Sequence, residues 1–219
     1  MGSEVNEHAD VEGDGRSARK RRAILDAATE VFLKSGYLGT NMDEIAALSA
    51  VSKQTVYKHF SSKEALFIEI VGGMTTGAGD TVHNDVAQLG ADEDLADYLV
   101  EYALRQLTVV LTPRIMQLRR LVIGEVTRFP ELARVLYERG PARAMKMLAA
   151  VFENLAARGL LTIGDPATAA EHFNWLIMSA PLNQAMLLGD AAIPSAAELR
   201  RNAEAGVRVF LAAYGSRQR

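Results

Sequence analysis

The sequence has no cysteine, one tryptophan and four histidines in 219 residues, and only 6% of its residues are aromatic. The lack of cysteine excludes disulfides, a catalytic thiol, thiolate zinc sites and iron–sulfur clusters. The histidines show no metal-ligand spacing, and there is no P-loop, dinucleotide fingerprint or Gly-x-Ser-x-Gly motif. We therefore expect no enzyme, no catalytic residues, no cofactor and no metal site.

Long apolar runs are also missing, since none reaches the roughly 18–20 residues that span a bilayer. Residues 1–15 carry five acidic side chains and no Lys or Arg, which is the opposite of a basic signal peptide. Their polar, non-periodic composition predicts a disordered acidic tail. The sequence thus favours a soluble, cytoplasmic protein that does not associate with membranes.

The formal net charge of −3 is unevenly distributed along the chain. Residues 1–15 contribute −5, residues 16–63 contribute +5, and the remaining residues contribute −3. A compact basic segment in a mildly acidic chain suggests a polyanion as its partner. A solvated positive face is the equally good alternative on charge alone.

Apolar residues recur at helical spacing from Arg16 onwards, and no stretch alternates as a strand does, so the predicted fold class is all-α. N-cap residues predict where helices begin: Asn41, Ser52, Ser61, Asp165 and Ser195. Glycine and proline predict where helices end: at Gly36, before Pro113, at Gly140-Pro141 and at Gly159. Four glycines within residues 72–79 predict a frayed helix end or loop, or alternatively a joint between two parts of the chain.

The stretch from Phe173 to Gly189 carries no charge, which is typical of a helix buried on all sides. In so small a chain we expect a second subunit to provide part of that burial. Gly206 and the small residues near it would let a partner helix approach closely. A central core helix in a monomer is the alternative.

Residues 41–60 form two short predicted helices joined by a tight turn at 49–51, a helix-turn-helix pattern. In the second helix, Val56 and Phe60 share one face and are expected to point into a small core. The outward side chains Lys53, Gln54, Thr55, Lys58 and His59 are of the types that bond base edges and phosphates of duplex DNA.

These residues resemble the DNA-binding domain of the tetracycline-repressor (TetR) family of bacterial regulators. The resemblance covers residues 19–67 and rests on an ordered series of motifs. They are Arg22-x-Ile24-Leu25-x-Ala27-Ala28-x-x-x-Phe32-x-x-x-Gly36-Tyr37, Thr40-x-x-x-x-Ile45-Ala46, Val51-Ser52-Lys53-x-Thr55-x-Tyr57-x-His59-Phe60 and Lys63-Glu64-x-Leu66. Residues 119–159 also resemble, less closely, the regulatory domain of a subgroup that includes efflux-pump repressors.

The resemblance implies a three-helix DNA-binding head over residues 16–62 and a body of about six helices over residues 63–219. It further implies a homodimer, formed through the two C-terminal helices, that binds a palindromic double-stranded DNA operator. Lys53, Gln54 and Thr55 would approach base edges or nearby phosphates, with Lys58 beside them. Tyr57, His59 and Lys63 would hold the phosphate backbone, and Thr40 would cap the second helix and touch a phosphate.

The resemblance also implies that the body binds a small apolar or amphipathic effector, which releases a repressor from its operator. Candidate cavity residues are the adaptable apolar and aromatic side chains of the body, any of which could instead belong to the core: Tyr102, Met116, Phe129, Met147, Phe152, Trp175 and Met178. The alternative function is a ligand-free regulator, or a DNA-binding protein whose body serves only dimerisation.

Two residues depart from the family pattern. Ala50 stands in the turn where glycine is usual, which would cost about 1 kcal/mol if that position needs a positive φ. Asp43 stands where a basic residue is common, and we expect its charge to weaken or redirect one DNA contact.

Overall fold

The computed structural model describes residues 4–83, 89–90 and 93–216. Within these ranges the chain contains helices and no β-strand, apart from one isolated bridge between Leu161 and Gly215, so the all-α prediction is confirmed. The chain divides into two compact units, Met1–Val71, here called the head, and Gly72–Arg219, here called the body. The sequence placed this division at residues 62/63, whereas the structure has it inside a helix.

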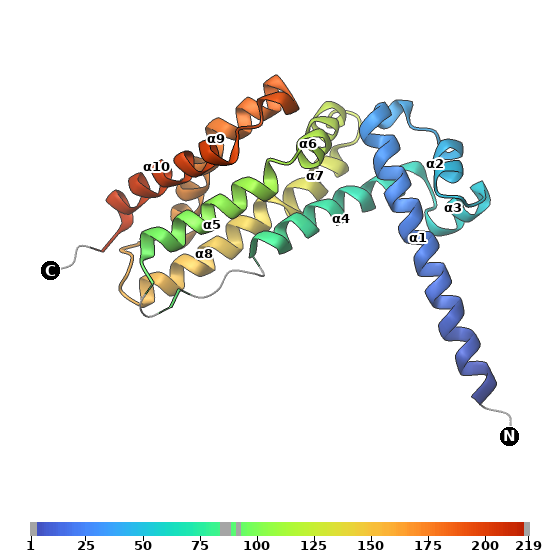
Figure 1. Ribbon diagram of the computed structural model, residues 1–219, viewed down its shortest axis with the longest axis horizontal. Coiled ribbons are helices and arrows are strands. Elements are labelled where there is room, and N and C mark those ends of the chain that lie inside the picture. Colours follow the sequence, from blue (N-terminus) through green and yellow to red (C-terminus); the bar gives the residue numbers. More distant parts are fainter. Residues whose placement is uncertain (1–3, 84–88, 91–92, 217–219) are drawn as a thin grey trace. The chain divides into compact units, whose positions relative to one another are not determined.

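The head consists of α1 (Glu4–Gly39), α2 (Met42–Leu48), α3 (Lys53–His59) and the first part of α4 (Lys63–His83) (Figure 1). Gly36 interrupts the helical geometry of α1 with a φ of 72°, which confirms the predicted helix end there. Residues 4–15, part of the predicted acidic tail, lie within the bounds of α1.

The core of the head forms where α1, α2, α3 and α4 meet. The ring of Phe67 lies 4.6 Å from that of Phe32 and 5.3 Å from that of Tyr37, between ring centroids. Val56 and Phe60 are buried, as their shared helical face predicted. The predicted cap at Ser61 was wrong by one residue, because the backbone N–H of Ala65 donates to the hydroxyl of Ser62, over 3.0 Å.

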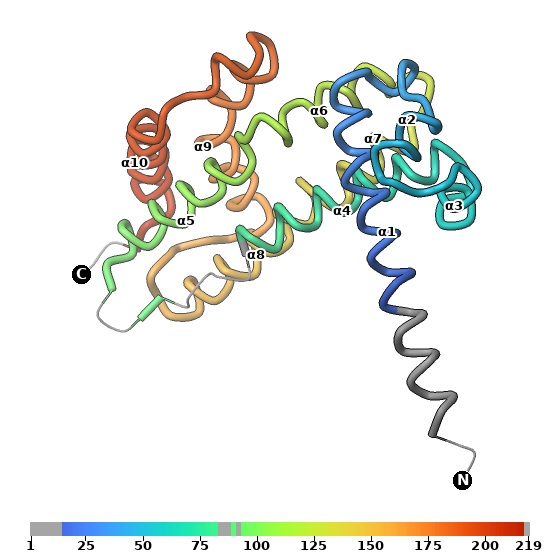
Figure 2. Tube along the Cα trace, turned by 45° about the vertical axis from the view of Figure 1, so that its right-hand side comes forward, coloured from blue at the N-terminus to red at the C-terminus, as the bar shows by residue number. Residues whose placement is uncertain are grey.

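The body contains α5 (Leu95–Val110), α6 (Pro113–Glu125), α7 (Pro130–Arg139), α8 (Pro141–Ala157), α9 (Pro166–Leu188), the short η1 (Asp190–Ala192) and α10 (Ala196–Tyr214). The predicted caps Asp165 and Ser195 are confirmed, since both side chains accept backbone N–H groups of the following turn. α10 packs on α5 and α9, and α8 packs on α9 (Figures 1 and 2). Their shared core includes the mutually contacting rings of Phe152, Phe173 and Phe210.

The glycine-rich stretch 72–79 is helical, so the prediction of a frayed end or loop was wrong. Two of its four glycines, Gly72 and Gly79, pack against other helices of the body, whereas Gly73 and Gly77 have open space where a Cβ would stand. The side chain of Arg139 lies where a Cβ at Gly72 would stand, and Arg143 Nη1 would lie 3.4 Å from a Cβ at Gly79. Arg143 also pairs with Asp80, with 2.6 Å between nitrogen and oxygen. Contacts with α7 and α8 therefore outweigh the low helix propensity of glycine.

Gly206 has a similar explanation, which corrects a second prediction. A Cβ at this position would lie 2.5 Å from Cδ1 of Ile177 and 3.3 Å from the carbonyl oxygen of Leu176. Gly206 thus admits α9 of the same chain rather than a helix of a partner subunit.

Candidate DNA-binding interface and effector cavity

The turn between α2 and α3 is held by local hydrogen bonds. The Ser49 hydroxyl donates to the carbonyl of Ile45 over 2.6 Å, and the Val51 N–H donates to the carbonyl of Ala46 over 3.1 Å. Between them Ala50 adopts a φ of 53°, in the left-handed region that favours glycine. The turn therefore keeps the geometry expected of a glycine, and the side chain of Ala50 is accommodated with strain.

α3 begins immediately after this turn, where the Ser52 hydroxyl accepts the N–H of Thr55 over 3.1 Å. One face, centred on Val56, is buried in the head. The side chains of Lys53, Gln54, Tyr57 and Lys58 are exposed, and those of Thr55 and His59 are half-buried. The structure thus brings the candidate base-reading and phosphate-binding side chains of α3 to one exposed surface, the arrangement of a helix that can enter a major groove.

The first residue of this surface is already paired within the head. Lys53 Nζ lies 2.9 Å from a carboxylate oxygen of Asp43 on α2, and this hydrogen bond raises the pKa of Lys53. Both side chains are more than half exposed, so solvent and salt screen the pair. Asp43 was predicted to act on DNA directly; the structure shows that it holds the lysine expected to approach the bases.

Thr40 and Lys63 take positions different from those implied by the resemblance. Asn41, not Thr40, caps α2, and the buried Thr40 hydroxyl donates to the carbonyl of Gly36 over 2.7 Å. Lys63 Nζ donates to the carbonyl of Thr40 over 2.9 Å and lies 4.9 Å from the ring centroid of Tyr37. The Thr40 side chain thus ties the segment before α2 to the end of α1, and the Lys63 side chain ties the same segment to the start of α4.

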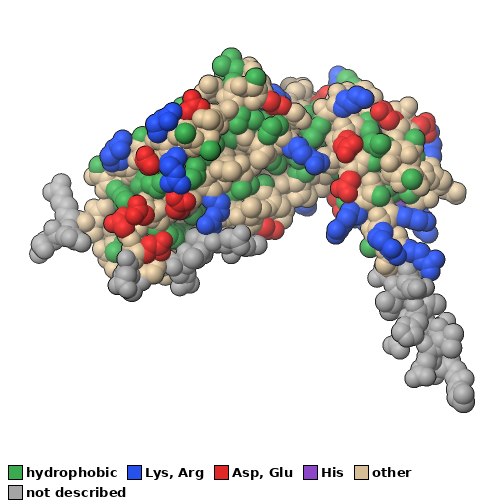
Figure 3. Space-filling view, in the orientation of Figure 1, with side chains coloured by type: hydrophobic (Ala, Val, Ile, Leu, Met, Phe, Trp, Pro, Cys, Tyr) green, Lys and Arg blue, Asp and Glu red, His purple; other side chains and the backbone are tan. Residues whose placement is uncertain are grey.

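Further basic side chains gather at the described end of α1 (Figure 3). This part of the sequence contains Arg16, Arg19, Lys20, Arg21 and Arg22. Arg21 pairs with Glu69 of α4 and lies over the ring of Phe60, 5.1 Å from the ring centroid. The head therefore carries a second positive region besides α3, as its charge of +5 over residues 16–63 predicted.

The body contains a partly open cavity of about 260 Å³ between α4, α5, α6, α7, α8 and α9. Its walls are mainly apolar, with Val82, Val110, Ile115, Leu118 and Leu182 among them. The glycine-rich part of α4 forms one wall through Thr75, Ala78 and Gly79. The volume lies just below the roughly 300–1,000 Å³ typical of sites for drug-sized ligands, so the cavity suits a compact molecule.

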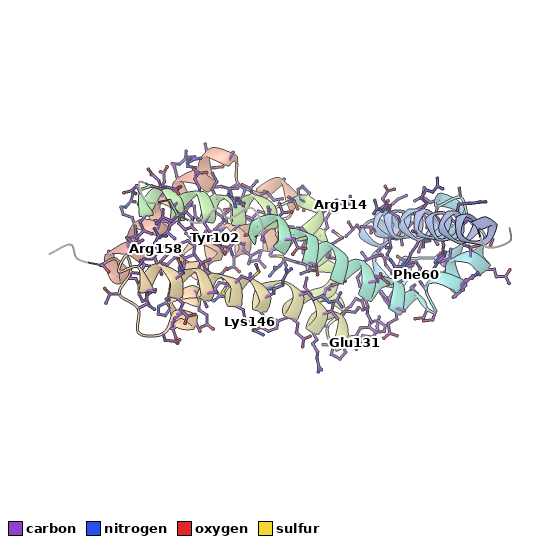
Figure 4. All side chains as sticks on the ribbon, turned by 90° about the horizontal axis from the view of Figure 1, so that it is seen from below. Phe60, Tyr102, Arg114, Glu131, Lys146 and Arg158 are labelled. Carbon is purple, nitrogen blue, oxygen red and sulfur yellow. The ribbon has the colours of Figure 1, made fainter. Side chains whose placement is uncertain are left out.

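Two of the seven candidate cavity residues, Trp175 and Met178, line this cavity. The other five are absent from its walls in the described structure. Tyr102, Met116 and Phe152 are buried in the main core, while Phe129 and Met147 are half-buried. Figure 4 shows Tyr102 among the helices of the body and Lys146, next to Met147, at its edge. Residue type alone could not separate core from cavity, because both are built from the same side chains.

Sequence reasoning missed the polar residues of the cavity. Gln106 on α5, Arg119 on α6 and Asn174 on α9 all line it. The Gln106 amide donates to the side-chain oxygen of Asn174 over 2.8 Å, and burial lowers the pKa of Arg119. A signal was present, because Arg119 follows Ile115 by four residues and precedes Val122 by three, which puts it on the predicted apolar face.

Comparison with known proteins connects both units to one family. Residues 24–70 match the family model "Bacterial regulatory proteins, tetR family", and residues 97–216, more than half of the chain, match "AefR-like transcriptional repressor, C-terminal domain".

Among curated proteins, the HTH-type transcriptional regulator RutR of Escherichia coli (strain K12) is 44% identical over 52 residues. That alignment covers 24% of each chain, so the chain matches only about a quarter of the length of such relatives.

Solved structures extend the similarity to nearly the whole chain. A crystal structure described as a TetR-family transcriptional regulator from Mesorhizobium loti MAFF303099 superposes with a TM-score of 0.86 and 42% identity, covering 91% of this chain and 98% of that one. The Flavonoid-responsive Regulator FrrA superposes with a TM-score of 0.73 and 30% identity, covering 92% and 100%.

No helix in the described part of the chain is long and apolar enough to cross a membrane. The helix-turn-helix geometry, the all-α body and the matches to both units agree with one another. The chain belongs to the TetR family, and it is a DNA-binding transcription regulator rather than an enzyme.

Proposed function

We propose that the protein is a cytoplasmic repressor that binds a palindromic operator as a homodimer and releases it when a small apolar or amphipathic effector enters the body. The observation that carries this proposal is the path of α4. Its first turns supply Leu66 and Phe67 to the core of the head, and its later residues Thr75, Ala78 and Gly79 line the cavity. A ligand that favours one position of these later residues can therefore act on the helix that holds the head.

The mechanism is a linked equilibrium. Two half-sites are read together only when the two heads of a dimer sit about one DNA turn apart. The dimer is in equilibrium between a form whose heads are spaced for DNA binding and a form whose heads are not. An effector shifts this equilibrium only to the extent that it binds one form more tightly than the other. The FrrA name describes that regulator as flavonoid-responsive, which supports a small organic effector for this chain as well.

A dimer through α9 and α10 is supported by the apolar side chains that these helices leave exposed. Trp175, Leu187 and Leu188 on α9 are 56%, 80% and 71% exposed, and Val209 on α10 is 55% exposed. Several large apolar side chains left exposed on the two helices are what an interaction site would use. Sedimentation analysis of Leu187→Asp should show a shift from dimer to monomer, and an unchanged dimer would place the interface elsewhere.

DNA binding is tested by gel-shift titration against the DNA upstream of the gene, at two salt concentrations. Tyr57→Ala should weaken a discrete complex by roughly 1–3 kcal/mol, because a hydrogen bond to a charged phosphate is lost. Lys58→Ala should also flatten the salt dependence by about one unit. Lys146→Ala is the matched control, since Lys146 is exposed on α8 of the body, and it should change neither.

If no discrete complex forms with that DNA, a genome-wide binding selection should recover the operator. Failure of both experiments would contradict a sequence-specific regulator. The alternative, a regulator whose body only dimerises, is tested by thermal-shift screening, because any ligand that binds the native state raises its melting temperature.

A further inference from the structure

Two residues that line the cavity of the body each carry a buried polar atom that the protein itself does not satisfy. The Nε of Arg119 and the Oε1 of Gln106 are both buried, and neither has a hydrogen-bond partner among the residues that the structure describes. The Gln106 side chain is only 5% exposed, so bulk water does not compensate for the missing partner. These two atoms belong to residues of different helices that line the same cavity.

Such atoms are costly in a folded protein, where the large majority of buried polar atoms have a partner. Arginine cannot lose its charge in compensation, since its guanidinium stays protonated at any physiological pH. The Gln106 amide already donates to Asn174, which leaves its oxygen as an acceptor without a donor. The cavity therefore offers one positively charged donor and one neutral acceptor.

The other charged groups near the cavity do not neutralise Arg119. Glu171 also lines the cavity, but it is exposed and forms no ion pair with Arg119 in the described structure. Arg143, behind Gly79, is already paired with Asp80. Arg105 leaves a buried nitrogen unpaired too, but it lies outside the cavity lining. Among the lining residues Arg119 is thus the one cation, facing walls that are otherwise mostly apolar.

We propose that the cavity binds a compact aromatic acid, whose carboxylate or phenolate oxygen pairs with Arg119 and whose hydroxyl group, where it carries one, donates to Gln106. The planar guanidinium fork matches an acidic oxygen pair better than any neutral group does. The apolar walls and the aromatic rings of Tyr137 and Trp175 take the ring system. This inference deepens the proposed function, because it names the chemical class of the effector.

Binding can be measured without DNA, because Trp175 is the chain's one tryptophan and lines the cavity. The probes are biphenyl-4-carboxylate and its methyl ester, which share the apolar body and differ in charge. Quenching of Trp175 fluorescence, checked by calorimetry, should show that the wild type binds the acid roughly tenfold or more tightly than the ester, the size of a charge-assisted hydrogen bond. Arg119→Gln should remove most of this difference while changing ester affinity by less than about twofold.

Arg114→Gln is the matched control, since Arg114 lies exposed on the same helix (Figure 4) and should leave both affinities unchanged. Melting curves of all variants exclude loss of the fold as the cause. Equal wild-type affinity for acid and ester, equal losses for both in Arg119→Gln, or no binding of either probe would each overturn the proposal. Operator binding is measured separately, in the gel shift. A failure of the acid to bind preferentially is therefore distinguishable from a failure of the proposed function.

Discussion

The head and the body differ in one respect, because a cationic side chain of the body, Arg119, has a buried nitrogen without a hydrogen-bond partner among the described residues. In the head, Lys53 pairs with Asp43, Arg21 pairs with Glu69, and Lys63 donates to backbone carbonyls. In the body, Arg120 and Arg143 are paired as well, but the buried Nε of Arg119 has no hydrogen-bond partner among the described residues. When the head binds DNA, its exposed ion pairs can be exchanged for contacts with phosphates. In the body, a ligand can supply the hydrogen-bond partner that Arg119 lacks.

The largest expected effects come from removing one buried aromatic ring from the core of the head or from the core of the body. Phe67→Ala and Phe173→Ala each remove a fully buried ring, from the head and the body respectively, and each should cost about 3–5 kcal/mol of unfolding free energy. Phe67→Ala should abolish DNA binding while the Trp175 signal still reports ligand binding, and Phe173→Ala should abolish that signal. If Phe67→Ala also eliminates ligand binding, the two units do not fold independently.

The second prediction concerns the unpaired cation. Arg119→Met should stabilise the ligand-free protein by about 1–3 kcal/mol, because a buried donor without a partner is replaced by an apolar side chain of similar length. Urea unfolding measures this change. A clear loss of stability instead would mean that Arg119 supports the fold rather than a ligand.

The neighbouring residue provides the control for this change. Arg120 pairs with Asp190 and donates to the carbonyl of Ala185 over 3.0 Å, so Arg120→Met should destabilise the body. Hydrogen bonds from Arg120 and Gln117 lower the pKa of Asp190. Asp190 therefore makes its whole contribution to the free energy of unfolding when the pH is above the ordinary aspartate pKa. This contribution is lost as the pH falls through the lowered pKa of Asp190. The penalty of Arg120→Met should shrink over that same acidic range.

The third prediction tests the turn of the head. Ala50→Gly should stabilise the protein by about 1 kcal/mol, since glycine adopts a φ of 53° without strain. The same substitution at Ala47, inside α2, should destabilise by a similar amount, because glycine is a poor helix former. Unfolding midpoints that shift in the same direction for both variants would rule out strain at Ala50.

The smallest expected effect concerns Asp43. Asp43→Asn should free Lys53 for DNA and raise the affinity by about 0.2–1 kcal/mol, the usual range of an exposed ion pair. The salt dependence should steepen by about one unit. Glu44→Gln, an exposed neighbour with no ion pair in the described structure, should change affinity less. Equal effects of the two variants would show that only overall charge matters.

Much of the head was predictable from the sequence because its determinants are local. The bounds of α3, the inward faces of Val56 and Phe60 and the strain at Ala50 follow from spacing, capping and turn chemistry. The contact of Lys63 with Thr40 was not predictable, because it joins residues from different elements. The pairing of Asp43 with Lys53 depends likewise on the angle between α2 and α3.

The body was predictable in its helices but not in its cavity. Proline and capping residues indicated where α7, α8, α9 and α10 begin, because these signals act within one turn. Whether an apolar residue lies in the core or lines a cavity depends on which helices face it, so Phe152 and Trp175 could not be told apart. The helical conformation of residues 72–79 was not predictable either, since the contacts of Gly72 with Arg139 and of Gly79 with Arg143 join residues far apart in the chain.

The most direct test of the account follows operator release and cavity occupancy in one titration. Labelled operator DNA bound to the protein is titrated with biphenyl-4-carboxylate, while DNA anisotropy and Trp175 fluorescence are recorded together. The account predicts that anisotropy falls as the cavity fills in the wild type, and that Arg119→Gln needs roughly tenfold more ligand for both changes. An operator that stays fully bound when the Trp175 signal is saturated would contradict coupling between the body and the head.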